Sequence, residues 1–384
     1  MEREDAAHAE SYLPDGLIEE LLDQTRVISD AIRGMFEGVT AQRDEMRTSL
    51  LGSGRVRLAG DLPRVPHPSV AAVDGALAIE QSLGADTALV VALGVEGLAQ
   101  EEKRQWKGVR YAHWERVLPH KGEDARSFAL GVMAALEIEI LANAPHDVVI
   151  LDGSHATPIV ALIKMLAITD PDFMQAAYEL CVDHNIPANL YEALQRTQIV
   201  GMVKYDASRH LAEKWLDEFK IPCDDRAMMT ILLEADEYTD PSLVGHPSRY
   251  QWNWNALQKL MVSGAYPHSD FVQSHFGKSI EYADQRQILL TYYKPHDWSP
   301  AYRVEVKREV AEDSEQLSRV LTAVREQVVS SEMREPYPQY LADVMAKSVS
   351  KGMSALRAAI FHELSIRGAH NYMRFVTQSY RTEV

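Results

Sequence analysis

The chain has 384 residues, 46% of them hydrophobic and 25% charged, which is ordinary for a folded protein and allows two or three structural units of roughly 150 residues. The formal net charge of -17 excludes a protein that coats nucleic acid through a generally basic surface, but not a nuclease with a local basic track. Two cysteines without zinc-ligand spacing, no leader segment and no apolar run long enough to cross a bilayer predict a cytoplasmic protein with reduced, buried thiols.

The beginning of the chain is typical of helices up to "GSGRVRLAGDLPRVPHP", a stretch that Gly and Pro mark as a boundary. We therefore expect an N-terminal helical segment over residues 1–62 and one main domain over residues 63–384. The apolar positions of the N-terminal helices predict a surface on which a partner docks.

Three strand-like stretches follow from Val70: "VAAVDGALAIE", "TALVVALGVEG" and "VRYAHWERVLPH". Their short connections predict an antiparallel meander. The 3.6-residue period of residues 123–144 predicts a helix, which leads into the strand of "DVVILDGSHA" at residues 147–156.

Two of these strands run into the same dipeptide, Asp-Gly, at Asp74 and at Asp152. Asp-Gly is a common turn pair, because glycine accepts positive φ and aspartate bonds the neighbouring backbone. Alternatively, both carboxylates lie at strand ends that face one cleft, where their oxygens hold a divalent metal. The repetition favours the metal interpretation and leaves the turn interpretation open.

The apolar stripe of the predicted helix contains one charged residue, Glu137. The apolar members of this stripe are Leu130, Met133, Ala134 and Leu141. A carboxylate in such a place is costly unless it is paired, bound to metal or at the edge of the core. Glu139 points away by about 200° of helical rotation, which makes Glu137 the ligand candidate. Substitution of Glu139 should therefore have little effect on activity.

The second half of the chain mixes helices with strands. Helical insertions are predicted at about residues 158–197 and 206–260, separated by the apolar strand of "QIVGMVKYDAS". Two more strands, "RQILLTYYKPH" and "YRVEVKREV", precede two closing helices that "REPYPQ" connects.

Three strands, a helix, another strand and a late helix are the element order of an RNase H-like α/β fold, a mixed sheet flanked by helices. In that architecture the first strand, the first helix, the next strand and a late helix each donate a carboxylate to a two-metal site. The residues on those four elements, in that order, are Asp74, Glu137, Asp152 and Asp343.

Several short motifs resemble one family, the NurA nucleases, which are partners of the hexameric DNA translocase HerA. The similarity rests on "VDGA" at 73–76, the helix of Glu137, "LDGS" at 151–154, "VGMVKYDAS" at 200–208 and "EPYPQYLAD" at 335–343. The pieces follow the family's order between residues 70 and 384.

The resemblance implies that Asp74, Glu137 and Asp152 bind two manganese or magnesium ions and that the C-terminal motif completes the site. Lys204 matches the family's lysine after an apolar strand, where it contacts a phosphate or orients a carboxylate. A solvated lysine at a strand end is the alternative interpretation of Lys204.

The chain departs from the family in the C-terminal motif, which elsewhere resembles Tyr-Pro-Tyr-Pro followed by a histidine. Glu335 stands at the place of the first tyrosine and Asp343 at that of the histidine, while Ala76 replaces a usual serine in the first motif. Either Asp343 or Glu335 then completes the site. Asp343 is favoured, because a helix places a ligand more rigidly than a loop does.

Two further stretches carry weaker signals. "FGKSI" at 276–280 lacks the glycine that a P-loop requires at the place of Val272, so no nucleotide site is predicted. "HPSRYQWNWN" at 246–255 has the composition of a surface that stacks single-stranded bases, although alternating aromatics also pack as strands.

The leading hypothesis is a metal-dependent DNA nuclease that hydrolyses phosphodiester bonds. The resemblance implies that it works as a homodimer beside a HerA-like ATPase, in DNA end processing or in defence against foreign DNA. The alternative is a noncatalytic adaptor of that ATPase, which keeps the fold only to bind its partner. Four carboxylates directed at one cleft favour the nuclease, because an adaptor has no use for them.

Overall fold

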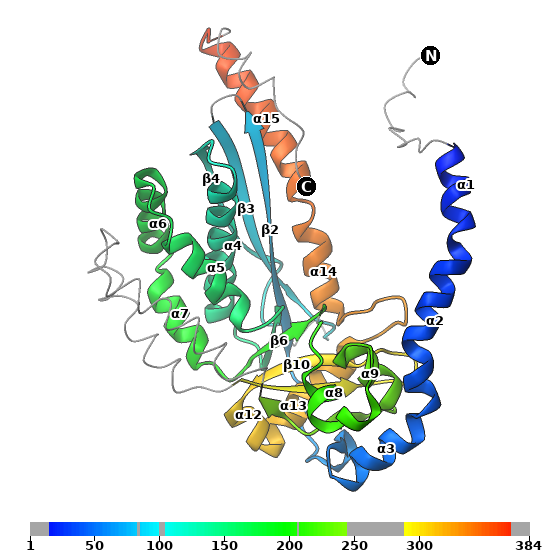
Figure 1. Ribbon diagram of the computed structural model, residues 1–384. Coiled ribbons are helices and arrows are strands. Elements are labelled where there is room, and N and C mark those ends of the chain that lie inside the picture. Colours follow the sequence, from blue (N-terminus) through cyan, green and yellow to red (C-terminus); the bar gives the residue numbers. More distant parts are fainter. Residues whose placement is uncertain (1–14, 83–84, 100–103, 206, 244–287, 370–384) are drawn as a thin grey trace, which may run out of the picture.

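Figure 1 shows the computed structural model of the chain, which describes residues 15–82, 85–99, 104–205, 207–243 and 288–369. The aromatic stretch at 246–255 and "FGKSI" at 276–280 lie outside the described residues.

One mixed sheet of ten strands runs through the described part of the chain. Its order is β1-β7-β9-β10-β6-β5-β2-β3-β4, and β8 pairs with β9. The strands are β1 Val56–Leu58, β2 Val70–Ser82, β3 Ala85–Glu96, β4 Arg110–Pro119, β5 Val148–Asp152, β6 Ile199–Val203, β7 Glu237–Thr239, β8 Ser242–Leu243, β9 Ile288–Lys294 and β10 Tyr302–Lys307.

The half of the sheet around β2 has the predicted order. β2 pairs antiparallel with β3, and β3 pairs antiparallel with β4, which forms the meander. β5 lies parallel to β2 on its other side, and β6 lies parallel to β5. The prediction of an RNase H-like mixed α/β sheet with flanking helices is therefore confirmed.

Helices cover both faces of this sheet (Figure 1). They are α1 Asp15–Asp23, α2 Thr25–Ala41, α3 Arg43–Gly52, α4 Glu123–Asn143, α5 Ala156–Leu166, α6 Pro171–Asp183, α7 Ile186–Gln195, α8 His210–Trp215, α9 Asp225–Leu232, α12 Arg308–Glu312, α13 Ser314–Gln327, α14 Tyr337–Ala346 and α15 Val349–Ile366. Short 3-10 helices cover Ala59–Asp61 and Asp217–Phe219.

Alternate residues of β2 belong to two cores, which therefore lie on opposite faces of the sheet. Ala71 and Val73 pack with α4 and the helices α5 to α7. Ala72 packs with α13 and β10, and Ala78, of the same parity, packs with α15. Since Asp74 has the parity of Ala72, its side chain lies on the face of α13, α14 and α15.

The N-terminal helices divide into an exposed part and an anchored part. Val39 of α2 and Met46 and Leu50 of α3 are buried in a third core with α8 and α9. The apolar side chains of α1 and of most of α2 are exposed, and Figure 1 shows this blue helical arm rising beside the rest of the molecule. β1 joins the sheet by pairing with β7. The proposed boundary between residues 62 and 63 stays a prediction.

The structure differs from the sequence-based expectation at three places. β2 continues through Asp74 and Gly75 without a turn, in unbroken register with β3. The last predicted helix, the one after "REPYPQ", is two helices, α14 and α15, and both lie along β2 and β3. A break between them lets the chain follow strands that twist, which one long straight helix does not. The second helical insertion also contains the short strands β7 and β8.

The two cysteines are buried free thiols, as predicted. No helix within the described ranges is both long and apolar enough to span a membrane.

Candidate metal centre

Asp74 lies in the middle of β2, where the strand passes below α14. Its Oδ1 accepts a hydrogen bond of 2.9 Å from the backbone N–H of Gly75. Gly75 is required for close packing and not for a turn, because a Cβ there would lie 2.5 Å from Met133 Cγ and 2.6 Å from Glu137 Oε1. The turn interpretation of the first Asp-Gly pair is therefore wrong.

Asp152 is the last residue of β5, a central strand whose preceding four residues are all buried. Here the chain does turn, since Gly153 has a φ of 115°, which favours glycine. Glu305 of β10, itself buried, holds this turn by accepting hydrogen bonds from Ser154 Oγ at 2.8 Å and from the His155 N–H at 3.1 Å. The turn that follows Asp152 is thus held from β10, which lies beyond β6 in the sheet.

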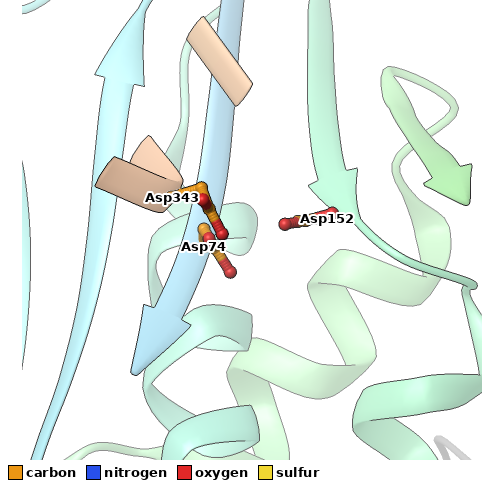
Figure 2. Close-up of side chains that lie close together, drawn as sticks. All are labelled: Asp74, Asp152 and Asp343. Atoms are coloured by element: carbon orange, nitrogen blue, oxygen red, sulfur yellow. The ribbon is translucent and has the colours of Figure 1, made fainter. Parts of the chain in front are cut away.

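Asp343 lies in the second turn of α14 and brings the third carboxylate to the same place. Oxygen atoms of Asp74, Asp152 and Asp343 all lie within 4.8 Å of one another. Figure 2 shows the three side chains directed toward a common point from β2, from the end of β5 and from the helix above β2. No other group of three such residues forms in the part of the chain that the structure describes.

Lys204 supplies the positive charge at this cluster. It follows β6, and its Nζ lies 2.6 Å from Asp152 Oδ2, 2.9 Å from Glu335 Oε2 and 3.5 Å from Asp343 Oδ1. Burial lowers the pKa of Lys204, but hydrogen bonding and attraction to Asp152 and Glu335 outweigh burial and raise the pKa above its usual value. Lys204 is thus a charged partner of the carboxylates, and the solvated-lysine interpretation is wrong.

The carboxylates differ in their affinity for protons. Burial, followed by repulsion from Asp152, raises the pKa of Asp74 to about 7. Burial alone would raise the pKa of Asp343, but its hydrogen bond to Lys347 and the charge of Lys204 keep this pKa below its usual value. Near neutral pH, Asp343 is therefore ionised while Asp74 is partly protonated.

Glu137 is buried on α4, on the other face of β2 from Asp74, because the side-chain position of Gly75 faces α4 and successive residues alternate. Burial, followed by repulsion from Asp74 and Asp152, raises the pKa of Glu137 well above its usual value. Glu137 is not a member of the group of three carboxylates. Its assignment as a metal ligand stays a prediction.

Glu139 turns away from the cluster, as its position on the helix predicts. Its Oε2 lies 2.8 Å from His184 Nδ1. Glu139 and Glu137 are thus two acids of one helix in different surroundings.

Two residues that support the site were not singled out from the sequence. Buried Gln339 of α14 donates a 2.8 Å hydrogen bond from Nε2 to Asp152 Oδ1. Glu305 holds the turn that follows Asp152. Gln339 lies inside the C-terminal motif, which was a signal for it, whereas Glu305 is one of three charged residues in β10 and nothing in the sequence singled it out.

The chain matches a known protein family. The family model of the NurA domain covers residues 68–347 of this chain. No curated protein matches the chain.

Solved structures agree with that match at the level of the fold. The NurA nuclease from Sulfolobus solfataricus aligns with a TM-score of 0.57 at 14% identity, covering 91% of this chain and 98% of that chain. A NurA crystal structure with manganese aligns with a TM-score of 0.52 at 12% identity, covering 88% and 98%. The domain match extends from the start of the meander to the end of α14 and includes Asp74, Asp152 and Asp343, so the chain belongs to the NurA family.

Proposed function

We propose that the protein is a metal-dependent DNA nuclease that hydrolyses phosphodiester bonds. The observation that carries this proposal is the meeting of Asp74, Asp152 and Asp343 from three separate elements in a NurA-family fold. Holding three acids together costs free energy, because like charges repel in a partly buried site. A bound cation would offset that cost.

The residues present fit manganese or magnesium, which prefer oxygen ligands. Their oxygens lie within 4.8 Å of one another, so they could bind a shared cation. We propose two ions, held by Asp74, Asp152 and Asp343, with Glu137 as a further candidate ligand. Bound ions of this kind make a water nucleophilic near neutral pH and stabilise the leaving oxygen.

The chain's own side chains have separate tasks in this proposal. Asp152, in contact with Gln339 on one oxygen and Lys204 on the other, is held in one orientation. Lys204 balances the negative charge of Asp152, Glu335 and Asp343 and lies where it can attract a phosphate oxygen of the substrate. Glu335 fixes Lys204 from the loop before α14.

We further propose that the protein acts in the cytoplasm as a homodimer, together with a HerA-like hexameric ATPase, in DNA end processing or defence against foreign DNA. Family membership supports the motor partnership, and the exposed apolar side chains of α1 and α2 offer a surface for one of these contacts. The net charge of -17 supports a need for a partner that delivers DNA.

The test is cleavage of labelled single- and double-stranded DNA by the full chain with manganese, with magnesium or with chelator, alone and with the partner ATPase. We expect metal-dependent cleavage that Asp152→Asn reduces by about 100-fold or more, since the negative charge that attracts the cations is lost. Glu139→Gln is the matched control, because it removes the same negative charge at a position that faces away from the cluster. Absence of cleavage with either metal, with or without the ATPase, would favour the noncatalytic adaptor.

A further inference from the structure

The turn after Asp152 lies directly on β6, and Gly201 of that strand makes room for it. The Gly153 N–H donates a hydrogen bond of 2.9 Å to the backbone oxygen of Met202. A Cβ at Gly201 would lie 2.8 Å from the backbone oxygen of Gly153, which is too close for any side chain. Glycine is therefore required at this position for the close approach of the two backbone segments.

Glu305 reaches the turn across the space that Gly201 leaves. It stands opposite Gly201 in the pairing of β10 with β6, and its side chain is fully buried. Its Oε2 accepts the hydrogen bonds from Ser154 Oγ at 2.8 Å and from the His155 N–H at 3.1 Å. Its Oε1 accepts one of 2.6 Å from Arg303 Nη2. Three donors thus hold both oxygens of this carboxylate in place.

The pair of Arg303 and Glu305 lies inside the protein, since Arg303 is only 8% exposed. A buried ion pair of this kind adds little stability compared with apolar residues of similar volume, because the loss of hydration offsets most of the attraction. Stability alone therefore does not account for the pair. The two hydrogen bonds from Glu305 to the turn give it a definite task.

Glu305 and the carboxylate of Asp152 lie on opposite faces of the sheet. Asp152 has the parity of Ile150, which is buried in the core with α13. Glu305 has the opposite parity to Val304 and Val306, and these two valines belong to that same core. Glu305 therefore faces away from the cluster and can act on Asp152 only through the turn.

We propose that Glu305 is a positioning residue: held by Arg303, it fixes the turn after Asp152 and so sets the direction of the Asp152 carboxylate and the affinity of the cluster for a divalent cation. The inference rests on the metal site of the proposed function and adds a support to it from the opposite face of the sheet. Losing an outer partner of a metal ligand typically costs about 10- to 100-fold in metal affinity.

The experiment is a calorimetric titration of the full chain with manganese, without DNA. The double variant Arg303→Met with Glu305→Leu replaces the ion pair by apolar side chains, an exchange that is often neutral or stabilising. We expect an unchanged or higher Tm in chelator and manganese binding that is weaker by about ten-fold or more. The matched control makes the same exchange at Arg47 and Glu237, a largely buried pair 2.7 Å apart that joins α3 to β7. The manganese affinity of the control should equal that of the wild type.

Ser154→Ala breaks the same contact from the side of the turn. Ser154 is half-buried, so this variant should fold and decides the outcome even if the double variant does not. It should also weaken manganese binding. Added to the exchange of Arg303 and Glu305, Ser154→Ala should cause no further loss, because the acceptor of its hydrogen bond is already gone. In cleavage assays, high manganese should restore the activity of these variants, with KM for DNA unchanged.

The outcomes separate this inference from the proposed function. Wild-type manganese affinity in Ser154→Ala and in the double variant, equal losses in the Arg47 and Glu237 control, or losses that add in the triple variant would each overturn the role of Glu305 and leave the nuclease standing. Weaker manganese binding in the variants of a chain that cleaves no DNA would support Glu305 and overturn the nuclease. A wild-type chain that binds no manganese would remove both proposals.

Discussion

Asp74 links the charge of the site to the stability of the protein. Its pKa is raised from 3.8 to about 7, mainly by burial and by Asp152, so the native state keeps a proton that the unfolded chain releases. The free energy of unfolding of the metal-free protein therefore falls as pH rises from about 4 to about 7 and stays low above that. Three pKa units correspond to at most about 4 kcal/mol.

We predict that Asp74→Asn stabilises the metal-free protein at pH 8, and much less at pH 5, because the amide carries no charge to bury. Its oxygen can still accept the hydrogen bond from Gly75. Denaturant unfolding in chelator at both pH values measures this difference. The control is Asp44→Asn, whose side chain is 98% exposed. A stability gain that is the same at both pH values would contradict the explanation.

Gln339 is predicted to be a positioning residue for Asp152. Gln339→Leu keeps apolar bulk in the buried position but removes the donor of the 2.8 Å hydrogen bond. Losing such an outer partner typically costs about 10- to 100-fold in metal affinity or activity. We expect a weaker manganese titration and a smaller manganese-induced rise in Tm, whereas Tyr340→Phe on the same helix should behave as wild type. Unchanged manganese affinity in Gln339→Leu would leave Gln339 with a structural role only.

At the scale of single residues, the sequence predicted that Asp74, Asp152 and Asp343 come together, but not how the surroundings of the two Asp-Gly pairs differ. The two Asp-Gly pairs look alike, yet Gly75 makes room for Met133 and Glu137 while Gly153 makes a turn. The two glycines can be distinguished only by how closely α4 packs against β2, and this packing is part of the tertiary structure. Glu137 was selected because it lies on an apolar stripe, and the same burial fits a protonated carboxyl below Gly75 as well as a metal ligand.

At the scale of elements, α14 carries the part of the site that departs from the family's motif. The helix begins at Tyr337 after Pro336, with Pro338 in its first turn, where proline is tolerated. Asp343 Oδ2 lies 2.6 Å from Lys347 Nζ, and Glu335 contacts Lys204 from the preceding loop. Asp343 belongs to the group of three carboxylates, whereas Glu335 does not.

We predict that Asp343→Asn lowers activity strongly at low manganese and that high manganese partly restores it, because the variant weakens an ion site without unfolding the helix. Glu335→Gln should reduce activity less and show no such rescue, since it acts on Lys204. The control Lys347→Ala keeps Asp343 in place and should need no additional manganese. Activity that survives Asp343→Asn at every manganese concentration but is lost in Glu335→Gln would transfer the ligand assignment to Glu335.

Element prediction succeeded where local periodicity and tertiary contacts agree. α4 and β5 appear as predicted. The helical period of apolar residues in α4 and the continuous aliphatic run of β5 both agree with the residues that are buried. The break between α14 and α15 was missed, since neither Lys347 nor Ser348 is a helix breaker. Both residues keep right-handed helical backbone angles, and the Ser348 N–H donates to Met345 O, three residues back, so the break is a local tightening of the helix.

At the scale of the molecule, the meander pairs strands that are neighbours in the sequence, and the place of β5 beside β2 follows from the predicted RNase H-like element order. The other half of the sheet depends on pairs far apart in the chain, such as β1 with β7 and β10 with β6. The pairing of β10 with β6 brings Glu305 beneath the turn after Asp152. Periodicity carries no information about which distant strands pair, so this support of the site could not be predicted.

The exposed side of α1 and α2 gives the last prediction. Its apolar residues are Leu17, Ile18, Leu21, Leu22, Val27, Ile28, Ile32 and Met35. Many exposed apolar side chains gathered on two consecutive helices are typical of an interaction site. We expect it to dock the HerA-like ATPase. Removal of residues 1–60 would be a poor test, because it also deletes Met46 and Leu50 from a core.

Removal of residues 1–34 keeps Phe36 and the buried Val39, so the remaining domain should fold and retain its basal cleavage. Binding to the ATPase should weaken by about ten-fold or more, because the buried apolar centre of an interface supplies most of its affinity. The double variant Leu21→Lys and Ile28→Lys should have the same effect in the full chain, and Glu20→Ala should not. Light scattering measures the mass of the truncated protein: if it becomes monomeric and still binds the ATPase, the surface is a dimer contact and the motor docks elsewhere.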